Sequence, residues 1–222
     1  MEITTSAGPA HVELELPAAQ PPKFLVVLTH GAGGTPDTAD VLAVKDAARD
    51  LGAATALVTQ PYRVRGARAP GSAAKQDAAW AELVAELRNQ TGRASGNTDA
   101  SGNTDTSIPL VQCGRSNGAR VACRTARDVK AAGVIALAFP LHPPGHPEKS
   151  RASELAEAGT PVLVINGDRD PFGIPDGSAS ETSTGTTVVV LPGETHSLTR
   201  NPAAIGEIAA EWLRALPGLA PR

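Results

Sequence analysis

The sequence predicts an α/β fold in which a doubly wound, mostly parallel sheet carries helices on both faces. Segments with strand patterns alternate along the chain with segments of helical spacing, which is the order expected for βαβ units. Most strand segments are continuous apolar runs, such as KFLVVLTH at Lys23–His30, and such runs are typical of strands covered on both faces. The amino-acid composition does not change along the 222 residues in a way that would mark a second domain, so we expect one domain spanning 1–222.

The first expected strand differs from the later ones. HVELEL at His11–Leu16 alternates polar and apolar residues, which predicts a half-exposed antiparallel edge strand. The later strands are short apolar runs, expected at Lys23–His30, Ala53–Thr59, Ile108–Cys113, Gly133–Phe139, Thr160–Asn166 and Thr186–Leu191. Helices are predicted where apolar residues recur at helical spacing. They are expected at Asp37–Leu51, Ser72–Asn89, Asn117–Ala132, Glu148–Ala158 and Pro202–Leu216.

The composition argues against several classes of partner. The net charge is −3 and the charges are interleaved, so nothing indicates a nucleic-acid footprint or a membrane-binding patch. Residues Met1–Gln20 lack the pattern of a secretory signal, and no apolar run approaches membrane-spanning length. Cys113 and Cys123 lack metal-ligand spacing and suggest two buried thiols in a reducing cytoplasm rather than a disulfide. We expect a cytoplasmic protein without a metal or cofactor, and nothing indicates its oligomeric state.

One segment breaks the regular alternation. ASGNTD at Ala94–Asp99 is repeated letter for letter at Ala100–Asp105. Such a polar tandem repeat cannot bury enough apolar area to offset the entropy of ordering it, so we expect a mobile low-complexity loop at about 92–106. Its position before a strand places it at the amino-terminal edge of the sheet, opposite the crevice where ligands bind in such folds. We therefore expect it to be functionally silent.

The stretch LVQCGRSNGAR places Ser116 between two glycines where a strand turns into a helix. The G-x-S-x-G spacing in this context is typical of a nucleophile elbow, in which Gly114 and Gly118 permit a tight turn that leaves the serine exposed. The helix that begins at Asn117 would direct its free N–H groups towards an oxyanion. The alternative is a plain strand-to-helix turn, which would not need both glycines.

A nucleophile elbow requires an oxyanion loop earlier in the chain. THGAGG at Thr29–Gly34 directly follows the first buried strand. Its glycines permit a backbone path that points the N–H of Ala32 towards the serine, while the amide of Asn117 supplies the second donor. A phosphate cradle is the alternative for such a loop, but neither the G-x-G-x-x-G nor the Walker spacing is present. His30 is expected to hold the turn rather than to take part in chemistry.

An acid and a histidine should follow the serine in the chain. NGDRDPFG offers Asp168 and Asp170 at the end of a strand. We favour Asp170, because it lies further beyond the strand end, whereas Asp168 is placed to cap the turn. His196 in PGETHSL is the one histidine after that acid, and it is the expected base. His142 is the second choice, because its loop also opens on the crevice.

Together these motifs resemble the α/β-hydrolase superfamily. More closely, the chain is similar to small cap-less bacterial hydrolases of the dienelactone-hydrolase-like group, through HGAGG, GRS-G-R, FPLHPPG-PEK, DPFG and HSL between Thr29 and Leu198. The resemblance implies Ser116 as nucleophile, Asp170 as acid and His196 as base. Thr195 departs from the smaller or acidic residue that relatives more often carry, and the duplicated ASGNTD is a second departure. Some animal relatives are subunits of a chromatin-modifying complex, so the resemblance establishes no substrate.

The substrate is only partly indicated. PLHPPGHPEKSR after the strand at Gly133–Phe139 is too short for a helical cap, which favours small or exposed esters. The loop Pro61–Pro70 carries Arg63, Arg65 and Arg68, which could bind an anionic group of a substrate or could be solvated surface cations. We expect a serine carboxylesterase acting on small-molecule esters. The alternatives are a thioesterase or acyl-transfer enzyme acting on carrier-bound substrates, and a non-catalytic interaction module.

Overall fold

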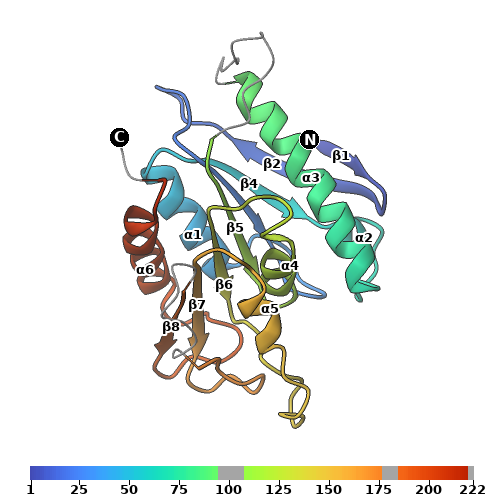
Figure 1. Cartoon of the computed structure of the whole chain (residues 1–222), viewed down its shortest axis with the longest axis vertical. Coiled ribbons are helices and arrows are strands. Elements are labelled where there is room, and N and C mark those ends of the chain that lie inside the picture. The colour runs from blue at the N-terminus through green and yellow to red at the C-terminus, as the bar shows by residue number, and fades with distance from the viewer. Residues whose placement is uncertain (95–107, 177–184, 220–222) are drawn as a thin grey trace.

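The computed structural model describes residues 1–94, 108–176 and 185–219, whose strands form one eight-stranded sheet (Figure 1). The strand order across the sheet is β1-β2-β4-β3-β5-β6-β7-β8. The strands lie at Glu2–Thr5 (β1), Gly8–Glu15 (β2), Leu25–Thr29 (β3), Ala54–Thr59 (β4), Leu110–Arg115 (β5), Gly133–Leu137 (β6), Val162–Gly167 (β7) and Thr186–Leu191 (β8). From β4 to β8 neighbouring strands pair in parallel. The predicted fold class is therefore confirmed.

The amino-terminal edge of the sheet differs from the prediction in one respect. The strand expected at His11–Leu16 is β2 and is antiparallel to β4, but it is not the edge strand. β1 pairs with it in antiparallel register, with Glu2 opposite His11 and Thr5 opposite Gly8. The four residues of β1 are too short a run to show a strand pattern on their own. They become a strand because β2 offers them an unpaired backbone edge.

The helices lie at Ala39–Asp50 (α1), Pro61–Val64 (α2), Ala73–Ala94 (α3), Asn117–Thr125 (α4), Ala152–Ala156 (α5) and Pro202–Ala215 (α6). α2 was not predicted and falls in the stretch that was read as an arginine-bearing loop. α3 continues beyond Asn89 to Ala94, so residues 92–94 of the loop expected at 92–106 are helical instead. Apart from Ala94, the ASGNTD repeat lies outside the described residues. α5 is shorter than the helix expected at Glu148–Ala158.

α4 ends earlier than the predicted helix at Asn117–Ala132. The residues after Thr125 form turns instead, and Lys130 adopts a left-handed conformation with φ of 52°. The N–H of Ala131 then donates to the carbonyl of Ala126 at 2.8 Å, which closes this turn. Local backbone geometry stops the helix although the apolar spacing continues, so the spacing alone overestimated its length.

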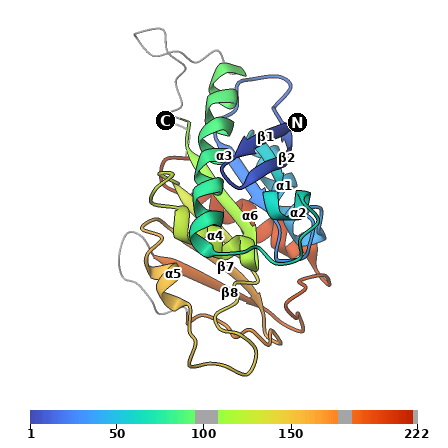
Figure 2. The same cartoon turned by 90° about the vertical axis from the view of Figure 1, so that its right-hand side faces the viewer.

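The helices cover both faces of the sheet (Figure 2). α1 and α6 pack on one face, where Val44 and Ile205 share a core with Leu28 and Ile135 of the strands. α3 packs on the other face over β3 and β4, and α4 and α5 cover the same face near β6 and β7. The buried side chains are mostly valine, leucine, isoleucine and alanine, and Cys113 and Cys123 are among them as free thiols. The continuous apolar runs of the sequence arise from this burial on both faces.

The parallel register brings the carboxyl ends of the central strands to one edge of the sheet. Thr29 at the end of β3 lies opposite Gly114 of β5, and Arg115 at the end of β5 lies opposite Leu137 of β6. Loops leaving these strands therefore converge at this edge, which is where doubly wound folds bind ligands. Residues 138–151 between β6 and α5 contain no helix or strand, in agreement with the prediction that no cap domain is present. No helix within the described ranges is long and apolar enough to cross a membrane.

Candidate active site

Ser116 occupies a tight turn between β5 and α4. Its backbone has φ of 52° and ψ of −112°, an uncommon conformation for a residue that is not glycine. A Cβ atom on Gly114 would lie 2.2 Å from the carbonyl carbon of Gly118, and one on Gly118 would lie 2.6 Å from the carbonyl oxygen of His30. No other residue type fits at either position without moving the backbone. The N–H of Ser116 donates to the carbonyl of Leu137 at 2.8 Å, which fixes the turn against β6.

The structure brings Ser116, His196 and Asp170 into one hydrogen-bonded row. Nε2 of His196 lies 2.9 Å from Oγ of Ser116, and Nδ1 lies 2.8 Å from Oδ2 of Asp170. The carboxylate of Asp170 is fully buried, while the imidazole is 20 % exposed. Oδ1 of Asp170 accepts the N–H of Phe172 at 2.9 Å, so both carboxylate oxygens have a donor. Such a row can take a proton from the hydroxyl and stabilise the resulting imidazolium.

The neighbouring candidates occupy other positions. Oδ1 of Asp168 accepts the N–H of Gly193 at 2.8 Å, so this carboxylate joins the ends of β7 and β8 instead of contacting His196. Nδ1 of His142 bonds to the carbonyl of Pro143 at 2.9 Å, and this histidine does not line the cavity beside Ser116. Asp170 and His196 thus belong to the hydrogen-bonded row that includes Ser116, whereas Asp168 and His142 do not.

Ala32 and Asn117 both line the cavity beside Ser116, where the two expected oxyanion donors would need to be. His30 fixes the position of the loop that carries Ala32. The imidazole of His30 bonds through Nδ1 to the carbonyl of Gly31 at 2.8 Å and accepts the N–H of Gln60 through Nε2 at 3.0 Å. His30 is fully buried, and burial, reinforced by the nearby Arg63 and opposed by the bond to Gly31, holds its pKa below the ordinary value. His30 thus connects the ends of β3 and β4.

The cavity beside Ser116 has a volume of about 340 Å³ and is open to solvent. Among the described residues, no aspartate or glutamate lines it, and three arginines do: Arg115, Arg120 and Arg151. Nε of Arg115 pairs with Asp40 at 2.9 Å, and its Nη2 donates to the carbonyl of His196 at 2.8 Å. Two nitrogens of Arg120 bind the carboxylate of Glu154, at 2.8 Å and 2.6 Å.

Arg151 differs from the other two arginines. Its Nη1 donates to the carbonyl of Pro140 at 2.8 Å, and within the described residues it has no carboxylate partner. Burial and the charge of nearby Arg120 lower the pKa of Arg151, although Glu154 opposes that shift. A partly buried cation without a carboxylate partner beside Ser116 is suited to hold an anion. Sequence reasoning missed it because Arg151 lies just beyond the FPLHPPG-PEK motif of its loop and far along the chain from the serine.

Two of the arginines for which the sequence left substrate binding open, Arg63 and Arg65, lie elsewhere. Arg63 donates through Nε to the carbonyl of Gly34 at 3.1 Å and through Nη1 to that of Ala67 at 3.0 Å. Arg65 bonds to the carbonyl of Ala7. Neither residue lines the cavity beside Ser116, so the structure does not bring them together with it. Arg63 instead holds the loop that contains Ala32.

With this geometry in view, comparison with known proteins places the chain in a family. The model of the alpha/beta hydrolase domain family matches residues 22–215, so the chain belongs to this family. The solved structures that it resembles include a serine hydrolase from Xanthomonas campestris, XC6422, described as having no lid. That structure has a TM-score of 0.72 and 20% sequence identity over 100% of this chain and 95% of the other.

Two further solved structures carry more specific names. Est1E from Butyrivibrio proteoclasticus, bound to ferulic acid, has a TM-score of 0.71 and 16% identity over 97% of this chain and 98% of its own. A dienelactone hydrolase from Anabaena variabilis has a TM-score of 0.66 and 18% identity over 97% and 96% of the two chains. At these identities the likeness establishes the fold alone. No curated protein sequence matches this chain significantly.

The described residues contain no group of three or more histidine, cysteine, aspartate or glutamate side chains arranged to hold a metal ion. His142 and His146 follow β6 in a proline-containing loop, and Nδ1 of His146 bonds to Glu148 at 3.1 Å. The hydrogen-bonded row of Ser116, His196 and Asp170 can perform proton transfer and nucleophilic attack by the serine.

Proposed function

We propose that the protein is a serine hydrolase that cleaves small carboxylic esters through an acyl-enzyme intermediate. The observation that carries the proposal is the row of hydrogen bonds from Ser116 through His196 to Asp170, at 2.9 Å and 2.8 Å. The strained elbow conformation of Ser116 supports it, because such strain persists where a nucleophile must be presented to a substrate. A scaffold protein would have no physical need of this arrangement.

The mechanism follows from the positions of these groups. Nε2 of His196 accepts the proton of Ser116, and Oγ attacks the ester carbonyl to form a tetrahedral intermediate. The imidazolium is stabilised by the buried carboxylate of Asp170, which also fixes the tautomer that leaves Nε2 free. His196 then protonates the departing alcohol, and water releases the acyl group by the same route. Backbone N–H groups of Ala32 and Asn117 would stabilise the oxyanion in both steps.

The preferred substrate in this proposal carries an anionic group near the scissile bond. The cavity is small, at about 340 Å³, and no cap covers it, which suits a small ester. Three arginines and no acidic residue line the cavity, and Arg151 has no carboxylate partner among the described residues. A carboxylate or phosphate on the substrate would supply the missing counter-ion through a charge-assisted hydrogen bond. The same cations would suit a thioester on a phosphate-bearing carrier, which makes it the second candidate.

A fluorophosphonate probe tests the proposed nucleophile. We expect the probe to label the protein at Ser116, to abolish hydrolysis of p-nitrophenyl acetate in proportion to labelling, and to leave Ser116→Ala unlabelled. Ser197→Ala is the matched control, because Ser197 is exposed and directly follows His196. Absence of labelling in folded protein would contradict the proposal. Comparing acetyl esters with acetyl thioesters that carry the same organic group on oxygen or on sulfur then separates the two candidate functions.

A further inference from the structure

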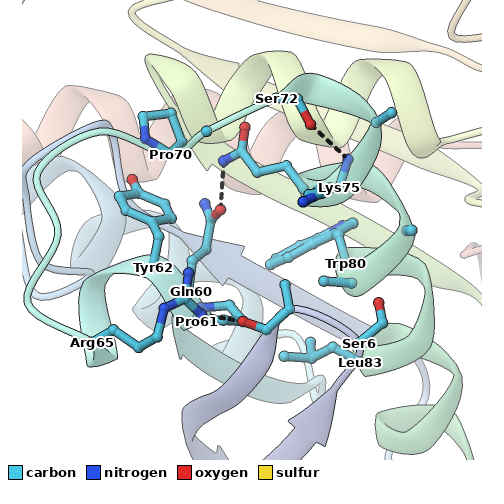
Figure 3. Close-up of a pocket in the computed structure, with 16 residues that line it drawn as sticks. Ser6, Gln60, Pro61, Tyr62, Arg65, Pro70, Ser72, Lys75, Trp80 and Leu83 are labelled. Atoms are coloured by element: carbon cyan, nitrogen blue, oxygen red, sulfur yellow. Dashed lines mark hydrogen bonds between the residues drawn. The ribbon is translucent and has the colours of Figure 1, made fainter.

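A second cavity, larger than the one beside Ser116, lies on the α3 side of the sheet (Figure 3). Its volume is about 840 Å³, within the range of small-molecule sites. The turn between β1 and β2, α2 with the loop that follows it, and the first half of α3 form its walls. The two cavities have no lining residue in common. The larger cavity is therefore a separate place for a ligand.

The inner surface of this cavity is mainly apolar. Trp80 and Leu83 from α3 face Tyr62 from α2 across it, and the exposed fractions of all three are 3 % or less (Figure 3). The buried polar groups there already have partners. Gln76 donates to Gln60 at 2.8 Å, and the indole N–H of Trp80 donates to Gln112. A ligand would thus meet apolar surface inside the cavity rather than free hydrogen-bonding groups.

The charged side chains that line this cavity are all positive. Arg65 at the end of α2 and Lys75 in the first turn of α3 come from two sides, and both residues are exposed. Within the part of the chain that the structure describes, no aspartate or glutamate lines this cavity. Within the described ranges Lys75 takes part in no ion pair, and Arg65 bonds only to the backbone of Ala7. An apolar interior with two uncompensated cations at the rim is complementary to a carboxylate on an apolar body.

We propose that this cavity is a second binding site, which takes a small organic carboxylate with an apolar body. The apolar body would pack against the more exposed apolar residues of the lining, Pro70, Ala74 and Ala78, and would remove their apolar area from water. The buried Trp80, Leu83 and Tyr62 would form the closed inner wall. The carboxylate would remain at the rim, with Lys75 as its main partner and Arg65 adding positive potential. The site is independent of the proposed esterase reaction, since its lining residues include none of the residues that act on Ser116.

The position of this site also gives it a connection to the loop that contains Ala32. Two of its lining residues hold that loop: the N–H of Gln60 donates to Nε2 of His30 at 3.0 Å, and the hydroxyl of Tyr62 donates to the carbonyl of Gly31 at 3.4 Å. Burial raises the pKa of Tyr62 to about 12, so its hydroxyl keeps its proton at neutral pH. A ligand packed against Tyr62 would touch the support of the loop without entering the cavity beside Ser116.

Binding can be measured directly with the full-length Ser116→Ala protein, in which the proposed reaction cannot occur. Octanoate is the probe, with octanol as the apolar control and acetate as the charge control. The chain contains two tryptophans, so the indole N–H resonance of Trp80 in a two-dimensional NMR spectrum is assigned by the variant Trp212→Phe. We expect octanoate to shift the Trp80 resonance saturably, while acetate leaves it unchanged and octanol shifts it only at higher concentration.

Variants of the rim and wall test the proposed contacts. Lys75→Ala is expected to raise the Kd of octanoate roughly threefold to fivefold, as is usual for an exposed ion pair, and to leave octanol binding unchanged. Arg68→Ala, in the same loop as Arg65 but outside the cavity, should have no effect. Ala78→Leu on the exposed wall of α3 should weaken octanoate binding, whereas Ala85→Leu, exposed on the same helix but outside the cavity, should not.

Two results would overturn the assignment. In the first, the Trp212→Phe protein is labelled at Ser116 with the fluorophosphonate and then no longer shows the octanoate-induced shift of Trp80. This result would show that octanoate enters the cavity beside Ser116. Equal affinities for octanoate and octanol, unaffected by Lys75→Ala, would show that the site does not select a carboxylate. Either result leaves the proposed ester hydrolysis intact, because that proposal is tested by labelling and turnover. Retained octanoate binding in the labelled protein would support two separate sites.

Discussion

Oδ2 of Asp170 lies 2.8 Å from Nδ1 of His196, while Asp168, two residues earlier, accepts the N–H of Gly193. The two carboxylates leave the same strand end, yet one faces the imidazole and the other closes the turn after β8. The bond to Asp170 requires a proton on Nδ1, which leaves Nε2 as the acceptor that faces Ser116. This difference in geometry gives the two aspartates different expected roles, although the sequence NGDRDPFG presents them side by side.

Replacing Asp170 with asparagine should separate these roles. Asp170→Asn is expected to fold and to lose ester turnover by roughly ten-thousandfold in kcat, because the amide no longer fixes the tautomer or stabilises the imidazolium. Asp168→Asn should lower kcat less than about tenfold and act mainly on the free energy of unfolding, by about 1 kcal/mol for one hydrogen bond. Steady-state kinetics and urea unfolding of both variants make the comparison. Equal losses of kcat would contradict the assignment.

The elbow gives a prediction about stability. Gly114→Ala would place a Cβ atom 2.2 Å from the backbone of Gly118, and neither segment can move away without disturbing the packing of β5 against α4. We expect the free energy of unfolding to fall by about 3 kcal/mol or more. Gly34→Ala is the control, since a Cβ there would meet its nearest neighbour at 3.6 Å, and its effect should stay within about 0.5 kcal/mol. Similar urea midpoints for the two variants would show that the elbow tolerates a side chain.

Much of the fold could be predicted because burial on both faces of a parallel sheet leaves continuous apolar runs such as Leu25–Thr29. The same reasoning missed β1 at Glu2–Thr5, since four residues show no pattern until β2 pairs with them. It also extended α4 past Thr125, because apolar spacing does not report the left-handed turn at Lys130. Strand interiors are thus encoded locally, whereas short edge strands and helix ends depend on tertiary contacts.

In the candidate site, too, some residues could be predicted from sequence motifs and others depend on tertiary contacts. Ser116, Asp170 and His196 each follow a strand within a recognisable motif, so the parallel direction of these strands is enough to bring them to one edge of the sheet. Arg151 reaches the cavity only through the path of residues 138–151, which contain no helix or strand. Arg63 carried the expected charge, but its guanidinium is hydrogen-bonded to loop carbonyls. Which cation is free depends on these contacts, and no sequence pattern reports them.

Arg151 gives a prediction about specificity. Arg151→Gln keeps a donor for the carbonyl of Pro140 but removes the charge. We expect kcat/KM for esters that carry a carboxylate near the scissile bond to fall roughly tenfold to a hundredfold, the loss of about 1.5–3 kcal/mol expected for a charge-assisted hydrogen bond. Neutral esters of the same size should be hydrolysed as before. The effect should shrink as salt is added, because Arg151 remains partly exposed.

Two control variants accompany this measurement. Arg68→Ala, in the loop for which the sequence left anion binding open, should leave hydrolysis of both ester classes unchanged. Arg63→Ala should lower kcat for neutral and anionic esters alike, because it releases the loop that contains Ala32 through the bond to Gly34. The proposal would be contradicted if Arg63→Ala lowered kcat/KM for anionic esters selectively and Arg151→Gln did not. That result would show that the Pro61–Pro70 segment binds the anionic group.

The last prediction concerns His30, which is buried between β3 and β4 and whose pKa is held below its ordinary value by burial. In the unfolded chain this histidine gains a proton as the pH falls below about 6.5, while the folded protein resists protonation. Stability from His30 is therefore fully present above that pH and is lost as the pH falls towards its folded pKa, at up to about 1.4 kcal/mol per pH unit. Urea unfolding from about pH 7.5 to pH 5 should show a steeper loss for the wild type than for His30→Gln, because glutamine does not titrate. The remaining histidines are common to both proteins, so equal slopes would show that His30 is protonated in the folded state as readily as in the unfolded chain.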